Sequence, residues 1–164
     1  MTIINKKSEE FLFKYLDNAS PTGHESSGQK IWLEYIKDYI DEWHLDNYGT
    51  LYSVINPGKP FKVVIEGHSD EISWMVNYIT DDGYIYVIRN GGTDQSIAPS
   101  KRVNIFTPKG VVKGIFGWPA IHTRKGNDTN LLATIENIFI DVGAKDKKEV
   151  EKMGIHVGCV ITYE

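Results

Sequence analysis

The 164-residue sequence predicts an α/β layer over residues 1–72, joined directly to a small β-rich barrel or sandwich over residues 73–164. Three observations support this prediction. An amphipathic helical pattern is followed by an apolar run without alternation, which is typical of a strand buried on both faces. Short β-prone runs separated by tight turns then fill the second half. Because no linker-like tract separates the two parts, we expect one module to be inserted into the other.

Two helices are expected near the N-terminus. Ser8 is the expected cap of the first helix. The apolar residues of that helix recur at helical spacing and are Phe11, Leu12, Tyr15 and Leu16. A polar loop containing Pro and Gly follows over residues 20–28. The second helix has the clearest amphipathic pattern, at i, i+3, i+4, i+7 and i+8, formed by Trp32, Tyr35, Ile36, Tyr39 and Ile40.

The following segment predicts strands. Residues 43–55 are expected to form two strands around a turn at residues 46–49. Residues 61–66 form the next expected strand, whose centre, Val63-Val64-Ile65, does not alternate with polar residues. Such a run is typical of the middle of an α/β sheet, so we expect this strand to be buried on both faces.

The second half predicts several short strands and one helix. A helix is expected from Asp146, its cap, to Met153, ending at Gly154. The expected strands lie at residues 84–88, 102–106, 111–116, 138–142 and 159–163.

Composition excludes several classes of protein. The chain has 18 Lys and Arg against 22 Asp and Glu, and this net charge of −4 argues against a general nucleic-acid binder. The single cysteine, Cys159, excludes an internal disulfide framework and is expected to be a buried, unreactive thiol in a reducing compartment. Neither a secretory signal nor a long apolar run is found, so a cytoplasmic chain without a membrane partner is expected.

The strongest candidate site is Glu66-Gly67-His68-Ser69-Asp70-Glu71, directly after the expected buried strand. In extended backbone, the side chains of His68 and Asp70 point the same way. One of them can therefore bind a metal while the other orients the imidazole or shapes the site. Acids at positions 66, 70 and 71 are electrostatically costly unless a cation shares the site. The same spacing also fits a hydrogen-bonded structural histidine, and the residues alone leave both interpretations open.

The other histidines favour structural roles. His44 and Asp46 repeat the spacing, but in an expected surface strand. His24 is expected at the surface and His156 in a strand-like run. His122 lies in a loop that either reaches a site or is exposed, and no role is assigned to it.

Several stretches together resemble the N-terminal part of the tetrahedral aminopeptidases, a family of dinuclear metallopeptidases. Members include glutamyl and deblocking aminopeptidases, and some carry endoglucanase labels. The clearest stretches read Pro-Thr-Gly-His-Glu, Asp-Asn-Tyr-Gly-Thr-Leu and Val-Ile-Glu-Gly-His-Ser-Asp-Glu-Ile. The stretches that carry the resemblance occur in order, at residues 21–25, 46–51, 64–72, 75–76, 102–103, 109–114, 138–144 and 153–161.

The resemblance implies a fold and a set of functional residues. It implies an α/β catalytic domain, here residues 1–72, interrupted by a small β-barrel-like domain, here residues 73–164, that helps to build a large homo-oligomer. His68 matches a metal ligand, and Asp70 matches the catalytic residue that supports it. Peptides would be the substrates, and two divalent ions the cofactors. Zinc or cobalt is expected, although His and carboxylate ligands also suit manganese.

The resemblance also implies that most of the metal site is missing. A dinuclear site needs about five protein ligands and a general base, and in the family the remaining acids and second histidine come later in the chain. We therefore expect the N-terminal part of an aminopeptidase, inactive alone, with at most one partial metal site. One alternative is a non-catalytic oligomerisation or binding module. A remote alternative is a glycoside hydrolase, which needs two carboxylates about 5–9.5 Å apart; the sequence offers no isolated pair of that kind.

Overall fold

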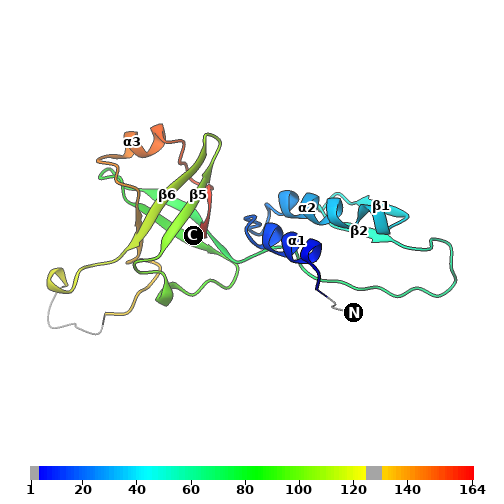
Figure 1. Ribbon diagram of the computed structural model, residues 1–164. Coiled ribbons are helices and arrows are strands. Elements are labelled where there is room, and N and C mark those ends of the chain that lie inside the picture. Colours follow the sequence, from blue (N-terminus) through cyan, green and yellow to red (C-terminus); the bar gives the residue numbers. More distant parts are fainter. Residues whose placement is uncertain (1–3, 125–130) are drawn as a thin grey trace. The chain divides into compact units, whose positions relative to one another are not determined.

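The computed structural model describes residues 4–124 and 131–164, and its contacts divide the chain into two units, Met1–Glu71 and Ile72–Glu164 (Figure 1). Helices and a small sheet form the first unit, and a closed β-barrel forms the second. The predicted fold class, α/β elements combined with a small barrel, is confirmed. The elements of the first unit are α1 (Lys6–Leu16), α2 (Ser26–Ile36), the short 3-10 helix η1 (Lys37–Tyr39), β1 (Glu42–Leu45) and β2 (Leu51–Val54).

The cap of helix α1 lies three residues earlier than expected. The cap is Asn5, whose side chain accepts from the Ser8 backbone N–H at 3.0 Å. The Ser8 hydroxyl in turn accepts from the Asn5 N–H at 2.9 Å, so the pair forms a reciprocal capping box. The prediction of Ser8 as the cap was therefore wrong, because Asn5 caps equally well and one turn earlier.

Helices α1 and α2 meet through aromatic side chains. The rings of Phe11 and Tyr35 stack with centroids 4.0 Å apart. Helix α2 begins within the expected loop, and there Gly28 permits close approach, since a Cβ at this position would lie 2.6 Å from the Ser20 hydroxyl. The helix ends at Ile36 and continues as η1, so of the predicted apolar face Tyr39 lies in the 3-10 helix and Ile40 lies beyond it in extended backbone.

The predicted hairpin is present, but the predicted buried strand is not. β1 and β2 form an antiparallel pair, with Trp43 opposite Ser53. Residues 61–66 have no strand structure, and Val63, Val64 and Ile65 are 74%, 82% and 94% exposed. The prediction of a strand buried on both faces was wrong for this chain. A strand needs a neighbour to accept its hydrogen bonds, and among the described residues β1 and β2 pair only with each other.

The second unit is a closed six-stranded barrel in the order β3-β4-β7-β6-β5-β8. All neighbouring strands are antiparallel. The predicted strands are all found, whereas β3 was not predicted. The bounds are β3 (Ser73–Ile79), β4 (Ile85–Asn90), β5 (Arg102–Thr107), β6 (Gly110–Gly117), β7 (Phe139–Asp141) and β8 (Val160–Tyr163), with short 3-10 helices η2 (Gln95–Ile97) and η3 (Ile121–Thr123).

The hydrophobic core lies inside this barrel. Trp74 and Phe116 meet edge to face with centroids 5.3 Å apart, and both are buried. Fully buried isoleucines and valines from the barrel strands surround them, including Ile105, Ile140 and Ile161.

The last helix and the cysteine agree with expectation, while His156 does not. α3 (Lys147–Lys152) is capped by Asp146, whose side chain accepts from the Glu149 N–H at 2.8 Å, and it is followed by Gly154 at φ +95°. Cys159 is buried and free. His156 lies in a turn region and is exposed, so its expected place in a strand was wrong.

Within the described residues, no helix combines the length and the apolar character needed to cross a membrane.

Candidate metal-ligand site

The candidate site depends on a contact between two distant segments of the first unit. The backbone N–H of Glu71 donates to the Ser20 carbonyl at 2.8 Å, and the Ser20 N–H donates to the Glu71 carboxylate at 2.7 Å. Pro21 and Glu71 form a parallel bridge. The loop between the two helices is thereby held against residues 69–71.

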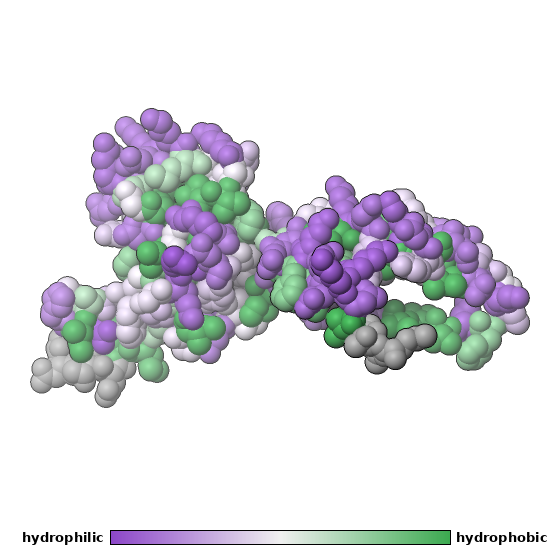
Figure 2. Space-filling view, in the orientation of Figure 1, coloured by the Kyte–Doolittle hydropathy of each residue, from purple (hydrophilic) through white to green (hydrophobic). Residues whose placement is uncertain are grey.

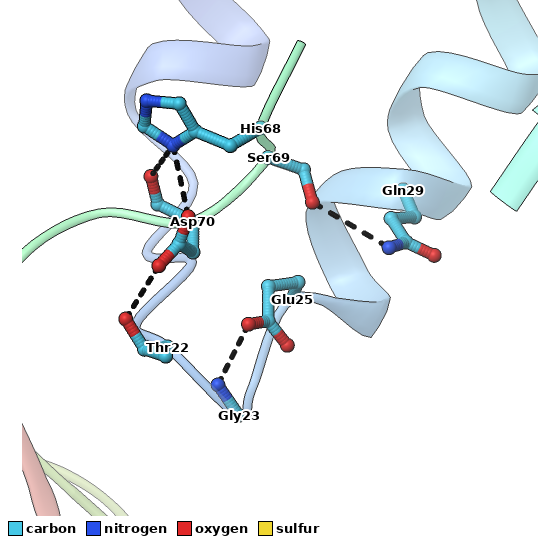
Figure 3. A network of polar contacts seen from close by, with 7 residues as sticks. All are labelled: Thr22, Gly23, Glu25, Gln29, His68, Ser69 and Asp70. Carbon is cyan, nitrogen blue, oxygen red and sulfur yellow. Dashed lines mark hydrogen bonds and ion pairs between the residues drawn. The ribbon is translucent and has the colours of Figure 1, made fainter. Parts of the chain in front are cut away.

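This contact brings Thr22, His68 and Asp70 together, as Figure 3 shows. The Thr22 hydroxyl donates to one Asp70 carboxylate oxygen at 2.5 Å. The other carboxylate oxygen lies 2.8 Å from Nδ1 of His68, which also lies 3.0 Å from the Asp70 backbone carbonyl. His68 and Asp70 thus contact each other as their spacing predicted, with Asp70 fixed between the ring and the loop.

The electrostatics of this group determine which imidazole nitrogen is available. The Thr22 hydroxyl, followed by His68, lowers the pKa of Asp70 below its usual value, so the group is a carboxylate at neutral pH. Both atoms that contact Nδ1 are acceptors, and Nδ1 must therefore carry the hydrogen. In the neutral ring this leaves the lone pair on Nε2, which points away from the other labelled residues in Figure 3. The His68 side chain is 85% exposed.

Hydrogen bonds resolve part of the expected crowding of negative charge. The Glu71 carboxylate is occupied by the Ser20 N–H, and the Asp70 carboxylate by Thr22 and His68. Glu66 is exposed to solvent. The acids around His68 are therefore each accommodated by protein donors or by water, and their number alone does not require a cation.

The donor set fits one position of a metal site. Within residues 4–124 and 131–164, no group of three or more His, Cys, Asp or Glu side chains is arranged to hold a metal ion. An imidazole whose Nδ1–H is held by a carboxylate is the usual arrangement of a metal-binding histidine. The described residues thus supply one suitable nitrogen, and the remaining ligands would have to come from elsewhere.

The side chains of the other histidines make no hydrogen bond with this group in the described part of the chain. His44 stacks on Tyr52 with centroids 5.0 Å apart, on the exposed hairpin, as its surface role predicted. His24 is exposed in the loop before α2, and its exposure was also predicted. His122 is exposed in η3.

Thr22 and Ser20 are the members of the site that no local pattern indicates. Thr22 lies 48 residues from the carboxylate to which it donates, and Ser20 lies 51 residues from Glu71. Only the Pro-Thr-Gly sequence of the loop drew attention to this segment, and that sequence predicts a turn and no particular partner.

Comparison with known proteins identifies the family. The family model of the M42 glutamyl aminopeptidases matches residues 49–164. The chain is 30% identical over 153 residues to a lysyl aminopeptidase of Pyrococcus furiosus, covering 92% of this chain and 44% of the relative. It is 31% identical over 157 residues to the putative aminopeptidase SgcX of Escherichia coli, covering 94% of this chain and 42% of the relative.

Solved structures of aminopeptidases resemble this chain as well. A TET aminopeptidase from a marine-sediment Thaumarchaeota archaeon superposes with a TM-score of 0.91 at 28% identity, covering 96% of this chain and 44% of that one. An aminopeptidase from Desulfurococcus kamchatkensis gives a TM-score of 0.88 at 29% identity, covering 98% and 44%. The chain spans less than half the length of these relatives and corresponds to their N-terminal portion. On the extent of the family match and of these superpositions, the chain belongs to the M42 glutamyl aminopeptidase family.

Proposed function

We propose that this chain is the N-terminal part of a metal-dependent aminopeptidase, in which His68 is a metal ligand and Asp70 holds its ring. The observation that supports this proposal is the chain of contacts from the Thr22 hydroxyl through the Asp70 carboxylate to Nδ1 of His68. Curated relatives of this chain bear the name aminopeptidase. The substrates would be peptides, and the compartment would be the cytoplasm.

In this proposal the two residues have different tasks. The Asp70 carboxylate accepts the Nδ1 hydrogen, which fixes the tautomer and the orientation of the imidazole. His68 then offers Nε2 to one of two divalent ions, with zinc or cobalt as the expected metal. Bound ions in such a site polarise the peptide carbonyl and make water a better nucleophile.

A single imidazole cannot hold a catalytic metal pair, so the 164-residue chain is expected to have negligible peptidase activity alone. Robust, metal-stimulated cleavage of an aminoacyl substrate by this chain would contradict the proposal.

Metal binding by His68 can be measured directly in this chain. In a zinc titration followed by ¹⁵N NMR, the resonance of His68 Nε2 should change at a lower zinc concentration than the imidazole resonances of the other four histidines. Asp70→Asn keeps an acceptor but removes its charge, and it should weaken zinc binding about tenfold, the lower end of the usual effect of such partners. His24→Ala is the matched control, because His24 is also exposed in the first unit and lies outside the contact network.

Two results would overturn the assignment. One is zinc binding that survives His68→Ala unchanged. The other is a titration in which all five histidines respond at the same concentration.

A second function, an oligomerisation module, is supported by the barrel. The barrel contains its own buried core and does not need the first unit to complete it. The TET1 peptidase of Pyrococcus horikoshii, 25% identical, can assemble into a tetrahedron or a large octahedral shell. We propose that this chain also forms a homo-oligomer through the barrel unit. Native mass measurement would show a discrete oligomer in that case, and a strictly monomeric chain would exclude it.

A further inference from the structure

The contact between His68 and Asp70 lies where water competes with it. The His68 side chain is 85% exposed and the Asp70 side chain is 33% exposed. Hydrophilic residues, purple in Figure 2, predominate on the visible face of the helices in the first unit. Pairs of exposed side chains gain little from their contact in such surroundings, because water screens the charges and both side chains lose rotamer freedom. Asp70 alone would therefore hold the imidazole weakly, and a further group is needed to fix the carboxylate.

Thr22 is placed to be that group. Its hydroxyl donates to one carboxylate oxygen of Asp70 at 2.5 Å, while the other oxygen lies 2.8 Å from Nδ1 of His68 (Figure 3). With a partner on each oxygen, the carboxylate cannot rotate without losing a hydrogen bond. The hydroxyl thus removes in advance part of the rotamer freedom that the pair would otherwise lose on contact.

The turn that carries Thr22 is closed by hydrogen bonds of its own. The His24 N–H donates to the Pro21 carbonyl at 2.7 Å, and Gly23 has φ +87°. A positive φ at the third position is typical of a type II turn, which favours glycine there. The Glu25 carboxylate also accepts from the Gly23 N–H at 2.7 Å. These bonds fix the backbone from which the Thr22 side chain reaches Asp70.

Two more contacts join this turn and helix α2 to the segment that follows His68. One is the reciprocal pair of hydrogen bonds between Ser20 and Glu71. In the other, the side-chain amide of Gln29 lies 3.5 Å from the Ser69 hydroxyl. Both set the distance between the two segments, whereas the Thr22 hydroxyl acts on the carboxylate that holds the ring.

We propose that Thr22 is a positioning residue for the candidate metal site and acts through Asp70 on the imidazole of His68. By holding the carboxylate against Nδ1, Thr22 keeps the hydrogen on Nδ1 and the lone pair on Nε2. A neutral imidazole in water favours the opposite tautomer, whose Nε2 carries the hydrogen and cannot bind a metal. The consequence for metal binding rests on the proposed function, but the choice of tautomer does not.

The tautomer can be measured in the 164-residue chain without any metal. ¹⁵N NMR at one alkaline pH, at which imidazoles are neutral, distinguishes the two forms of the His68 ring. Thr22→Val keeps nearly the same shape but removes the hydroxyl, and it should move the ring toward the Nε2–H form. Thr22→Ser restores a hydroxyl and should keep the wild-type tautomer.

Ser27→Ala is the matched control. It removes another hydroxyl beside the same loop, one that accepts from the Asn18 side chain at 3.1 Å and donates to the Ala19 carbonyl at 3.5 Å. This variant should leave the His68 tautomer unchanged.

Zinc binding gives a second readout, in the titration described under the proposed function. Thr22→Val should need about threefold to fivefold more zinc to half-saturate His68 Nε2. This effect is smaller than that of Asp70→Asn, because the carboxylate and its charge remain. Thr22→Ser and Ser27→Ala should bind zinc as the wild type does.

The proposal is overturned if Thr22→Val keeps the wild-type tautomer, or if Thr22→Ser behaves like Thr22→Val. It is also overturned if Ser27→Ala shifts the tautomer, because general loosening of the loop would then explain the effect. Loss of the Ser20–Glu71 pair in Thr22→Val, seen from the Glu71 amide resonance, would show a merely structural role and overturn it too. If zinc does not select His68 in the wild type while the tautomer still depends on Thr22, the metal assignment fails and the positioning role is supported.

Discussion

Gly114 in β6 is predicted to be a position where a single methyl group destabilises the barrel. The residue is paired with Val103 of β5, and β7 lies on its other side. A Cβ at this position would lie 2.7 Å from Cγ2 of Ile140 and 3.2 Å from Cγ1 of Val142. Real Cβ atoms essentially never approach a carbon as closely as 2.7 Å, so Gly114→Ala requires β7 or its side chains to move.

The loss of stability expected from Gly114→Ala depends on how little the Ile140 side chain can move. Its side chain is fully buried, and Cγ2 is attached directly to a β-branched carbon whose χ1 rotation is restricted. Overpacking of a core of this kind costs about 1–3 kcal/mol. For a unit the size of Ile72–Glu164, this lowers the melting temperature by about 5–15 °C.

Two other glycines of the same unit provide graded controls. A Cβ at Gly117 would meet the outer atoms of the Phe139 ring at 2.6 Å, and this half-buried ring can rotate away, so Gly117→Ala should cost less. At Gly92 no atom lies within 4 Å and φ is not positive, so Gly92→Ala should leave the melting temperature unchanged or slightly raised. Thermal unfolding followed by circular dichroism gives the ranking. The reasoning would be refuted if the melting temperature of Gly114→Ala equalled that of Gly92→Ala or exceeded that of Gly117→Ala.

Three further predictions concern hydrogen bonds and burial. Thr22→Val removes the leading cause of the lowered pKa of Asp70, so NMR titration of the carboxyl should show that pKa rising toward its usual value; an unchanged pKa would contradict the assigned contact. In the wild type the Asp70 contacts contribute stability above the pKa of the unfolded chain, and this contribution is lost as pH falls through the lowered folded value. Burial raises the pKa of Tyr163, so in an alkaline absorbance titration its phenol should ionise after the exposed tyrosines, with Tyr163→Phe deleting only the late step. Because that pKa is raised, the related stability is complete below the unfolded pKa and is lost as pH rises through the folded one. Asp146→Ala removes the α3 cap and should lower the barrel's melting temperature by about 4–8 °C, the effect of about 1 kcal/mol, whereas Asp146→Asn should stay close to wild type.

The sequence predicts those elements whose signal is local. The strand near residues 111–116 lies between Gly-containing turns, and α3 has both a capping Asp146 and a terminating Gly154, so both were found. β3 was not predicted, because residues 73–79 follow an acidic stretch without a turn signal and do not alternate cleanly. Residues 61–66 show the opposite case: the composition of the run indicates a strand, but a strand forms only where a neighbour exists.

The same distinction holds in the candidate site. His68 and Asp70 are two residues apart, and their contact is readable from extended backbone geometry. Thr22 reaches Asp70 only because Ser20 and Glu71 join their segments, and no periodicity encodes a contact across 48 residues. The sequence pattern therefore predicts the contact between His68 and Asp70, but not the contacts with the loop at residues 20–22 that hold Asp70 in place.

The position of β3 beside β8 has a consequence for how the barrel can be accommodated in a longer polypeptide. These are its first and last strands, and Trp74 stands opposite Ile161 in an antiparallel pair. The chain therefore enters and leaves the barrel at neighbouring positions, because the start of β3 lies beside the end of β8. A folded barrel inserted into another domain therefore holds the two host segments close together. The host domain then loses only the conformational entropy of closing a short loop, and not that of closing a loop as long as the whole barrel sequence. Evolution could enlarge, exchange or delete such a module while the route of the host backbone stays the same.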